Sequence, residues 1–140
     1  MFDLNDCAAF ITNKTSKMLS ERLEARMAVY HVTRTQWLAM YFISRTPGMT
    51  QNELAESLGT KGSTVVSLLD RMERDGLITR TTVAEDRRVR HLALTDNGKK
   101  VLVKLTAVAE KFKEDAIRNL SEKDLDIFKS VLETMIKNTD

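Results

Sequence analysis

The sequence is poor in the residues that reverse or cross-link a chain. It has five glycines and one proline among 140 residues, whereas β-sandwiches and barrels need many turns. Its single cysteine, Cys7, excludes an intrachain disulfide and suits a reducing compartment. No apolar run approaches the roughly 18 residues of a membrane span, and residues 1–6 lack the basic and apolar regions of a signal peptide. We therefore expect a mainly helical, cytoplasmic protein.

Motifs of catalysis and metal binding are also missing. The chain has no glycine-rich phosphate loop and no recognisable nucleophile motif. Its two histidines, His31 and His91, lie far apart in sequence, and neither belongs to a Cys-x-x-Cys or His-x-x-x-His pair. We expect no enzyme activity, no metal and no cofactor.

The net charge of +2 is small, but the charges are distributed unevenly along the chain. Residues 1–60 carry six basic and six acidic side chains, and residues 92–140 carry nine of each. Residues 61–91 carry seven basic and five acidic side chains, so the whole positive excess lies in this segment. Such a local excess indicates an anionic partner for the middle of the chain.

Apolar periodicity and capping residues predict six helices. Steps of three and four between apolar residues predict a first helix over about residues 4–27, with Asp3 as its N-cap. Thr33 and Gln36 fit a capping box at the start of a second helix, which is apolar nearly all round and therefore buried. The remaining helices are predicted from Thr50 to Gly59, from Gly62 to Asp75 and from Thr95 to about residue 117. Ser121 together with Asp124 opens the last helix, which continues to about residue 136.

Residues 51–70 have the spacing of a helix-turn-helix motif. Gly59 supplies a left-handed turn residue, and Ala55 is small where the two helices would cross. One face of the second helix is apolar and the other is polar, and its N-terminus can bring amides and hydroxyls to phosphates and base edges. The pattern is typical of a helix that reads the DNA major groove, although a small-residue turn between two core helices would give it too.

A β-hairpin is predicted directly after this motif. Residues 77–83 and 89–94 contain partly alternating Ile, Val and Thr, and the turn-prone residues 84–87 lie between them. The tip, residues 85–90, places three arginines within four residues on a projecting loop. Exposed ion pairs contribute only about 0–1 kcal/mol to a fold, whereas an arginine can enter the narrow minor groove of DNA. The candidate DNA contacts are Gln51, Lys61, Ser63, Thr64, Ser67, Arg71, Arg74, Asp86, Arg87, Arg88 and Arg90.

Three segments of this region resemble the signature of the MarR family, the multiple antibiotic resistance regulators. The family pattern is Gly-Leu-Ile/Val-x-Arg, a wing Asp-x-Arg, and then Leu-x-Leu-Thr-x-x-Gly. The matching segments are Leu77-Ile78-Thr79-Arg80, Asp86-Arg87-Arg88 and Leu92-Ala93-Leu94-Thr95-Asp96-Asn97-Gly98. The resemblance extends to residues 68–77 and to Thr33, Gln36 and Trp37, and it covers essentially the whole chain. It implies a winged helix-turn-helix homodimer that binds double-stranded DNA and regulates transcription, usually as a repressor.

The resemblance also implies how the chain is divided. We expect an N-terminal dimerisation helix at residues 1–32, a DNA-binding lobe at residues 33–95 with its wing at about residues 77–94, and C-terminal dimerisation helices at residues 96–140. The long apolar stripes of the terminal helices favour a partner chain independently. With one motif per protomer, the expected operator is pseudo-palindromic.

Within the wing, the resemblance makes Arg88 the minor-groove residue and Asp86 the residue that orients the wing arginines. A winged helix used only for protein contacts is the alternative, and the acidic residues Asp70 and Asp75 favour it.

The resemblance further implies a site for a small effector between the dimer region and the DNA-binding lobe, commonly for an aromatic acid or another amphipathic compound. Aromatic, thioether and basic side chains gather where the first helix is expected to meet the second, and they suit an aromatic carboxylate. These candidates are Met18, Tyr30, His31, Arg34, Trp37, Met40 and Tyr41. The same spacing is also that of an ordinary core.

Cys7 suggests a redox-responsive regulator as a further alternative. Residues 8–10 offer nothing to lower the pKa of its thiol, apart from a helix N-terminus. A role as a small, buried apolar residue is therefore favoured.

Overall fold

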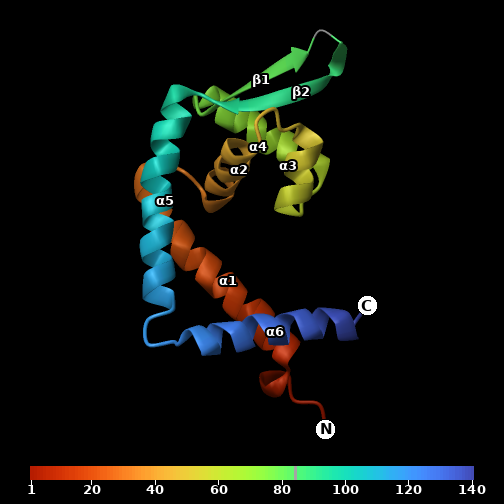
Figure 1. The fold of residues 1–140 in the computed structure, drawn as a ribbon, viewed down its shortest axis with the longest axis vertical. Coiled ribbons are helices and arrows are strands. Elements are labelled where there is room, and N and C mark those ends of the chain that lie inside the picture. The colour runs from red at the N-terminus through yellow and green to blue at the C-terminus, as the bar shows by residue number, and fades with distance from the viewer. Residues whose placement is uncertain (84) are drawn as a thin grey trace. The chain divides into compact units, whose positions relative to one another are not determined.

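The computed structural model describes residues 1–83 and 85–140, apart from the side chains of Val83, Asp86 and Arg87. These residues form six α-helices and one antiparallel pair of strands (Figure 1), which confirms the predicted fold class. The elements are α1 (Ala8–Met27), α2 (Arg34–Arg45), α3 (Gln51–Leu58), α4 (Gly62–Arg74), β1 (Ile78–Val83), β2 (Asp86–Leu94), α5 (Asp96–Ala116) and α6 (Glu122–Asn138).

The N-terminal segment differs from the prediction. The Asp3 carboxylate accepts a hydrogen bond from the Asn5 amide at 2.9 Å and so closes a short 3-10 turn, Leu4–Asp6. Cys7 then has extended backbone, and α1 begins only at Ala8. The continuous helix predicted from residue 4 is therefore wrong in its first turn.

The chain divides into two compact units, Met1–Ala109 and Glu110–Asp140. In the first unit, α3 packs against α2 and α4, and α4 packs against β1. The predicted capping box of α2 is formed in both directions: Gln36 N donates to Thr33 Oγ1 at 3.1 Å, and Thr33 N donates to Gln36 Oε1 at 3.0 Å. The largest fully buried side chains of this unit are Met27, Met40, Leu54, Val65, Leu69, Met72, Ile78, Leu92 and Leu105.

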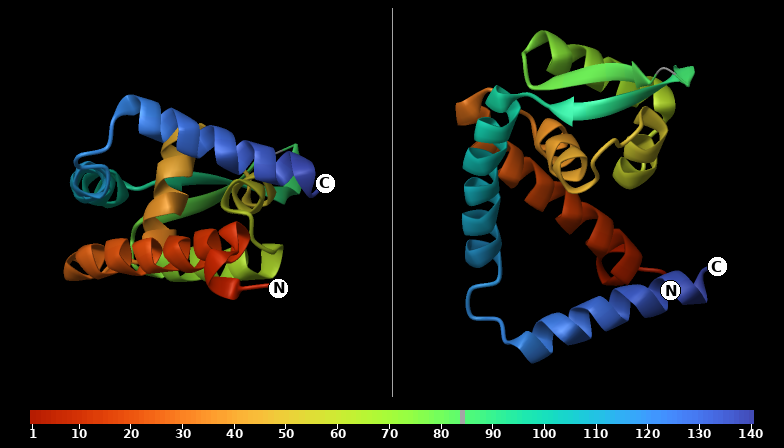
Figure 2. Two further views of the ribbon diagram at one scale, coloured as in Figure 1. Left: turned by 90° about the horizontal axis from the view of Figure 1, so that it is seen from below. Right: turned by 45° about the horizontal axis from the view of Figure 1, so that its top comes forward.

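The predicted hairpin is present, but its return strand begins earlier than expected. β2 starts at Asp86 rather than at residue 89, because Val83 already pairs with Asp86 after a shift of register. The three arginines therefore lie on a strand, and the prediction that they lie on a loop is wrong. Ala84, in the predicted turn, lies outside the described residues. Figure 2 shows the two paired strands from two further directions. The other pairs include Ile78–Leu94, Arg80–Leu92 and Thr82–Arg90.

The second unit contains the end of α5 and all of α6. The predicted capping box of α6 is formed: Asp124 N donates to Ser121 Oγ and Ser121 N donates to Asp124 Oδ2, both at 3.0 Å. These hydrogen bonds hold the pKa of the Asp124 carboxyl below its ordinary value. None of the described helices is long and apolar enough to cross a membrane.

Gly98 joins the start of α5 to the base of the hairpin. A Cβ at this position would collide with the Leu77 carbonyl oxygen and lie only 3.0 Å from its carbon. Because this contact is with backbone, we expect Gly98→Ala to lower the free energy of unfolding by about 1–3 kcal/mol, measured by urea denaturation. The matched control is Gly62→Ala, where a Cβ meets nothing within 4 Å. An equal urea midpoint for Gly98→Ala and wild type would contradict the close packing.

Candidate nucleic-acid interface

Helix α4 has one buried and one exposed face. On the apolar face, Val65, Leu69 and Met72 are buried and Leu68 is half-buried. The exposed side carries the candidate contacts on this helix, and Lys61 at the N-cap is exposed as well. Lys61 provides no side-chain cap, so the first amides of α4 are available to an acceptor such as a phosphate. The exposed candidates are Lys61, Ser63, Thr64, Ser67, Arg71 and Arg74.

The other candidate of the motif, Gln51, lies at the start of α3 and is half-buried. Its Oε1 is buried and has no hydrogen-bond partner among the described residues. Its role as a DNA contact stays a prediction.

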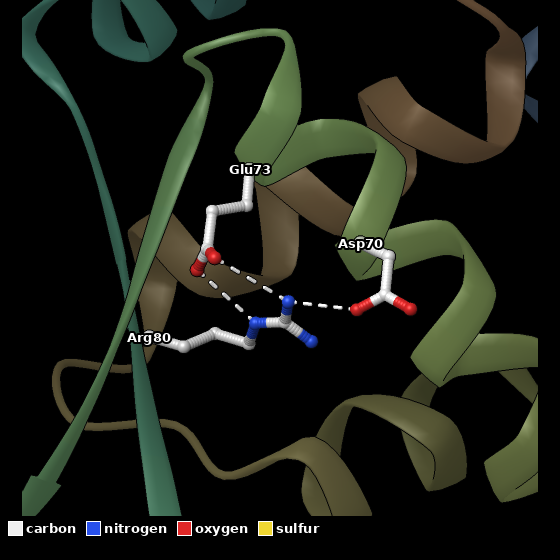
Figure 3. Close-up of polar contacts among 3 residues, drawn as sticks. All are labelled: Asp70, Glu73 and Arg80. Atoms are coloured by element: carbon white, nitrogen blue, oxygen red, sulfur yellow. Dashed lines mark hydrogen bonds and ion pairs between the residues drawn. The ribbon is translucent and has the colours of Figure 1, made fainter.

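Arg80 of β1 joins the hairpin to α4 (Figure 3). Its Nη2 lies 2.7 Å from Asp70 Oδ1, and its Nε donates to Glu73 Oε2 at 3.1 Å. The Arg80 side chain is only 9% exposed, whereas those of Asp70 and Glu73 are 60% and 44% exposed. One half-buried arginine therefore holds two carboxylates of the exposed helix face.

The positive charge of Arg80 offsets the negative charges of Asp70 and Glu73 on the exposed side of α4. The hydrogen bond from Arg80 lowers the pKa of Glu73, and the positive charges of Arg80 and Arg90 act in the same direction. The hydrogen bond to Glu73 in turn raises the pKa of Arg80. The acidic Asp70, which favoured a protein-only interface, is thus compensated by Arg80.

The lowered pKa of Glu73 predicts a pH dependence of stability. Because the folded state favours the ionised carboxylate, this stabilisation is present above the ordinary glutamate pKa of about 4.3 and is lost as the pH falls through the folded-state value. We expect Glu73→Gln to lose less stability than wild type between about pH 6 and pH 3, as measured by urea midpoints. The control is Glu56→Gln, at an exposed position of α3. Parallel pH profiles for wild type and Glu73→Gln would contradict the pairing.

The wing arginines extend the basic surface beyond α4. Arg88 and Arg90 are exposed on β2, while Val89 between them is half-buried. The register shifts between Arg90, which pairs with Thr82, and Asp86, which pairs with Val83. The side chains of the other two wing candidates, Asp86 and Arg87, lie outside the described part of the structure. Arg88 and Arg90 therefore add two exposed guanidinium groups to the basic surface.

The base of the wing is hydrogen-bonded to the turn before α3. Leu92 N donates to Met49 O at 2.8 Å, and His91 Nδ1 lies 2.6 Å from Gly48 O. Thr50 forms an additional bridge with His91. The hairpin and the helix-turn-helix thus form one connected lobe.

Comparison with known proteins assigns this arrangement to a family. The sequence model of the MarR family matches residues 31–89. The structure of the S. aureus MepR–DNA complex has 25% sequence identity and a TM-score of 0.88, and the match covers 94% of this chain and 98% of that one. The repressor CouR, bound to a 23-mer DNA duplex, has 26% identity and a TM-score of 0.86, with coverage of 95% and 94%. The transcriptional regulator PA3341 has 30% identity and a TM-score of 0.81, with coverage of 94% and 96%.

The chain belongs to the MarR family. This confirms the resemblance and the winged helix-turn-helix fold. MarR-family proteins are transcription regulators rather than enzymes, so the expected absence of catalysis follows from membership of the family.

The predicted effector residues of this MarR-family protein lie in different surroundings. Met40 is fully buried. Trp37 and Tyr41 are half-buried with their ring centroids 6.2 Å apart, and Trp37 Nε1 donates to Thr106 Oγ1 at 3.3 Å. The half-buried Arg34 donates its backbone amide to Glu24 Oε2 at 2.7 Å. Three of the candidates are exposed, namely Met18, Tyr30 and His31.

A cleft of about 390 Å³ lies beside α4 instead. Apolar carbon and hydroxyl groups line it together with one arginine and one glutamate, and none of the seven predicted effector residues is among them. The lining residues are Glu24, Thr33, Thr35, Leu58, Thr60, Thr64, Ser67, Leu68 and Arg71. Three of these, Thr64, Ser67 and Arg71, are also candidate DNA contacts.

Cys7 is half-buried at the N-cap of α1, and its redox role stays a prediction. Among the residues that the structure describes, no group of three or more His, Cys, Asp or Glu is placed to hold a metal ion.

Sequence reasoning did not assign a role to Arg80. The alternation of β1 could have predicted that Arg80 faces the core side of the sheet. Arg80 lies two residues from the buried Ile78 and pairs with the buried Leu92. An arginine on the buried face of a strand requires a carboxylate partner. Asp70 and Glu73 are close in sequence and could have been proposed.

Proposed function

We propose that this MarR-family protein acts as a homodimer that binds a pseudo-palindromic DNA duplex and represses transcription. The observation that carries the proposal is the joint exposure, on one connected lobe, of the polar face of α4 and of Arg88 and Arg90 on β2. CouR and MepR have each been seen with DNA, and both match this chain over almost its whole length. In this proposal residues 33–95 bind DNA, whereas residues 1–32 and 96–140 form the dimer.

Each element has its own task on the duplex. The N-terminal half of α4 enters the major groove, where Ser63, Thr64 and Ser67 approach base edges. Lys61, Arg71 and Arg74 bind phosphates, which supports affinity rather than sequence selection. Arg88 enters the minor groove, where the negative potential is strongest if the groove is narrow.

The proposed DNA binding is tested by selecting duplexes from a random pool with the purified protein. We expect a single enriched sequence with two related halves, and no enrichment would contradict the proposal. On the selected duplex, Lys61→Ala should reduce the slope of log K against log salt by about one unit for each phosphate that Lys61 neutralises in the wild type. The slope of Lys14→Ala, at an exposed lysine of α1, should equal that of wild type.

The proposed dimer rests on apolar side chains that each unit exposes. In the first unit, α1 exposes Phe10, Ile11, Met18 and Leu19. In the second unit, Leu120 and four residues of α6 are between 49% and 73% exposed, namely Ile127, Phe128, Val131 and Ile136. Contiguous apolar surface of this kind marks an interaction site, and a second copy of the chain is the partner that family membership favours.

Light scattering after size exclusion tests the dimer. We expect a wild-type mass of twice the 15.9 kDa chain and a monomer for Phe128→Asp, because a carboxylate cannot be buried unpaired in an apolar interface. Lys129→Asp is the matched control at the neighbouring exposed position. A wild-type monomer at micromolar concentration would contradict the proposal.

The effector that we propose is a small amphipathic or aromatic acid. The cleft beside α4 supports it, because Arg71 can pair with a carboxylate while Leu58 and Leu68 contact an apolar ring. Since Thr64, Ser67 and Arg71 are proposed DNA contacts too, an acid in the cleft would compete with DNA directly. The group of residues around Trp37 and Arg34 is the second location, as the sequence suggested.

Thermal shifts with a panel of aromatic acids, measured without DNA, separate these locations. An acid that binds only the folded protein raises the melting temperature, and the shift grows with the logarithm of the acid concentration once that concentration exceeds Kd. Loss of the shift in Arg71→Gln but not in Arg34→Gln supports the cleft, and the reverse supports the group around Trp37. No shift in wild type with any acid would contradict the proposed class of effector.

A further inference from the structure

Val66 is an exposed apolar side chain on the helix proposed to read DNA. Its exposure is 42%, whereas the neighbouring Val65 is buried. Among the described side chains of residues 31–102, no other large hydrophobic residue is exposed. Valine is also a poorer helix former than alanine, so neither burial nor helix propensity accounts for its presence.

The helix places Val66 among the candidate DNA contacts. Ser63 and Asp70 lie three residues before it and four residues after it, and therefore share its strip of the α4 surface. Ser67 is adjacent, and all three side chains are exposed. The Val66 methyl groups consequently belong to the face that the proposed function places in the major groove.

The polar neighbours of Val66 discriminate little between bases. Asp70 Oδ1 is held by Arg80 Nη2 at 2.7 Å, so part of its charge and hydrogen-bonding capacity is already committed to the hairpin. The hydroxyls of Ser63 and Ser67 both donate and accept hydrogen bonds, so they suit any base edge. The major-groove group that an apolar side chain recognises is the C5-methyl of thymine.

We infer that Val66 contacts a thymine C5-methyl in each half-site and thereby selects thymine over cytosine at one position. The inference rests on the proposed function, since it requires α4 to lie in the major groove. Transfer of one methyl-sized group from water to an apolar contact changes affinity about fourfold. Two half-sites together change it about fifteenfold.

Deoxyuridine provides the test, because uracil lacks only the methyl group and keeps the same base pair. In the selected duplex each thymine is replaced in turn by deoxyuridine, and Kd is measured by fluorescence anisotropy. With wild type we expect a loss of about fourfold at one position in each half-site. Val66→Ala should lose less affinity than wild type when thymine is replaced by uracil, because only the shorter Cβ methyl of alanine is left to contact the thymine methyl.

Val103→Ala is the matched control, because it makes the same truncation at another exposed valine, on α5. It should keep the wild-type preference for thymine over uracil. If no position responds to uracil, or if the preference of Val66→Ala for thymine over uracil is as large as that of wild type, the inference is wrong while DNA binding stands. If wild type selects no duplex, the proposed function and this inference both fail.

Discussion

Arg88→Ala is expected to weaken binding to the selected duplex at least about thirtyfold. One specific arginine contact contributes about 1–3 kcal/mol to DNA recognition, and a dimer presents two wings, so the minimum loss is about 2 kcal/mol. Arg88 is exposed on β2 beside Arg90, and truncation of an exposed side chain should leave the fold and the dimer intact. Fluorescence anisotropy at fixed salt measures the loss.

Arg118→Ala is the control for charge alone. It removes the same guanidinium from an exposed position outside residues 61–91, where it pairs with Asp115 at 2.6 Å. We expect its DNA affinity to be close to that of wild type. Equal affinities for wild type and Arg88→Ala would remove the wing from the proposed interface.

Arg80→Met is expected to impair both stability and DNA binding. Arg80 makes charge-assisted contacts with both Asp70 and Glu73, and these contacts hold the hairpin against α4. Methionine keeps the apolar stem in contact with the core but releases the two carboxylates on the exposed side of α4. Because these charges would face DNA phosphates, we expect at least a tenfold loss of affinity, in addition to a lower urea midpoint.

A rescue variant separates the two effects. Adding Asp70→Asn and Glu73→Gln to Arg80→Met removes the uncompensated charges but does not restore the ion pairs. We expect the triple variant to recover most of the DNA affinity while its urea midpoint stays below that of wild type. Failure to recover any affinity would show that Arg80 acts by placing the hairpin rather than by neutralising the helix.

Local features of the fold could be predicted because they depend on residues close together in sequence. The helix capping boxes at Thr33–Gln36 and Ser121–Asp124 are made by residues three positions apart, and both are formed as predicted. Likewise, Gly59 has the left-handed backbone, with φ 66°, that its place between two helices required.

Other features depend on contacts between distant segments. The start of β2 follows from the pairing of Val83 with Asp86, and alternation of residue types alone could not locate it. The cleft beside α4 arises only when Glu24, Thr33 and Leu58 are brought next to Arg71 by packing. The aromatic spacing around Trp37 could not distinguish a binding site from a core, and the structure places Met40 in the core.

A footprint on the selected duplex tests most directly whether this protein reads DNA as a dimer through α4 and the wing. Hydroxyl-radical cleavage should show two protected half-sites whose major-groove centres lie about 34–36 Å apart, roughly one helical turn. Minor-groove protection should flank them and should disappear with Arg88→Ala. A single protected half-site, or protection independent of sequence, would contradict the proposed mode of binding.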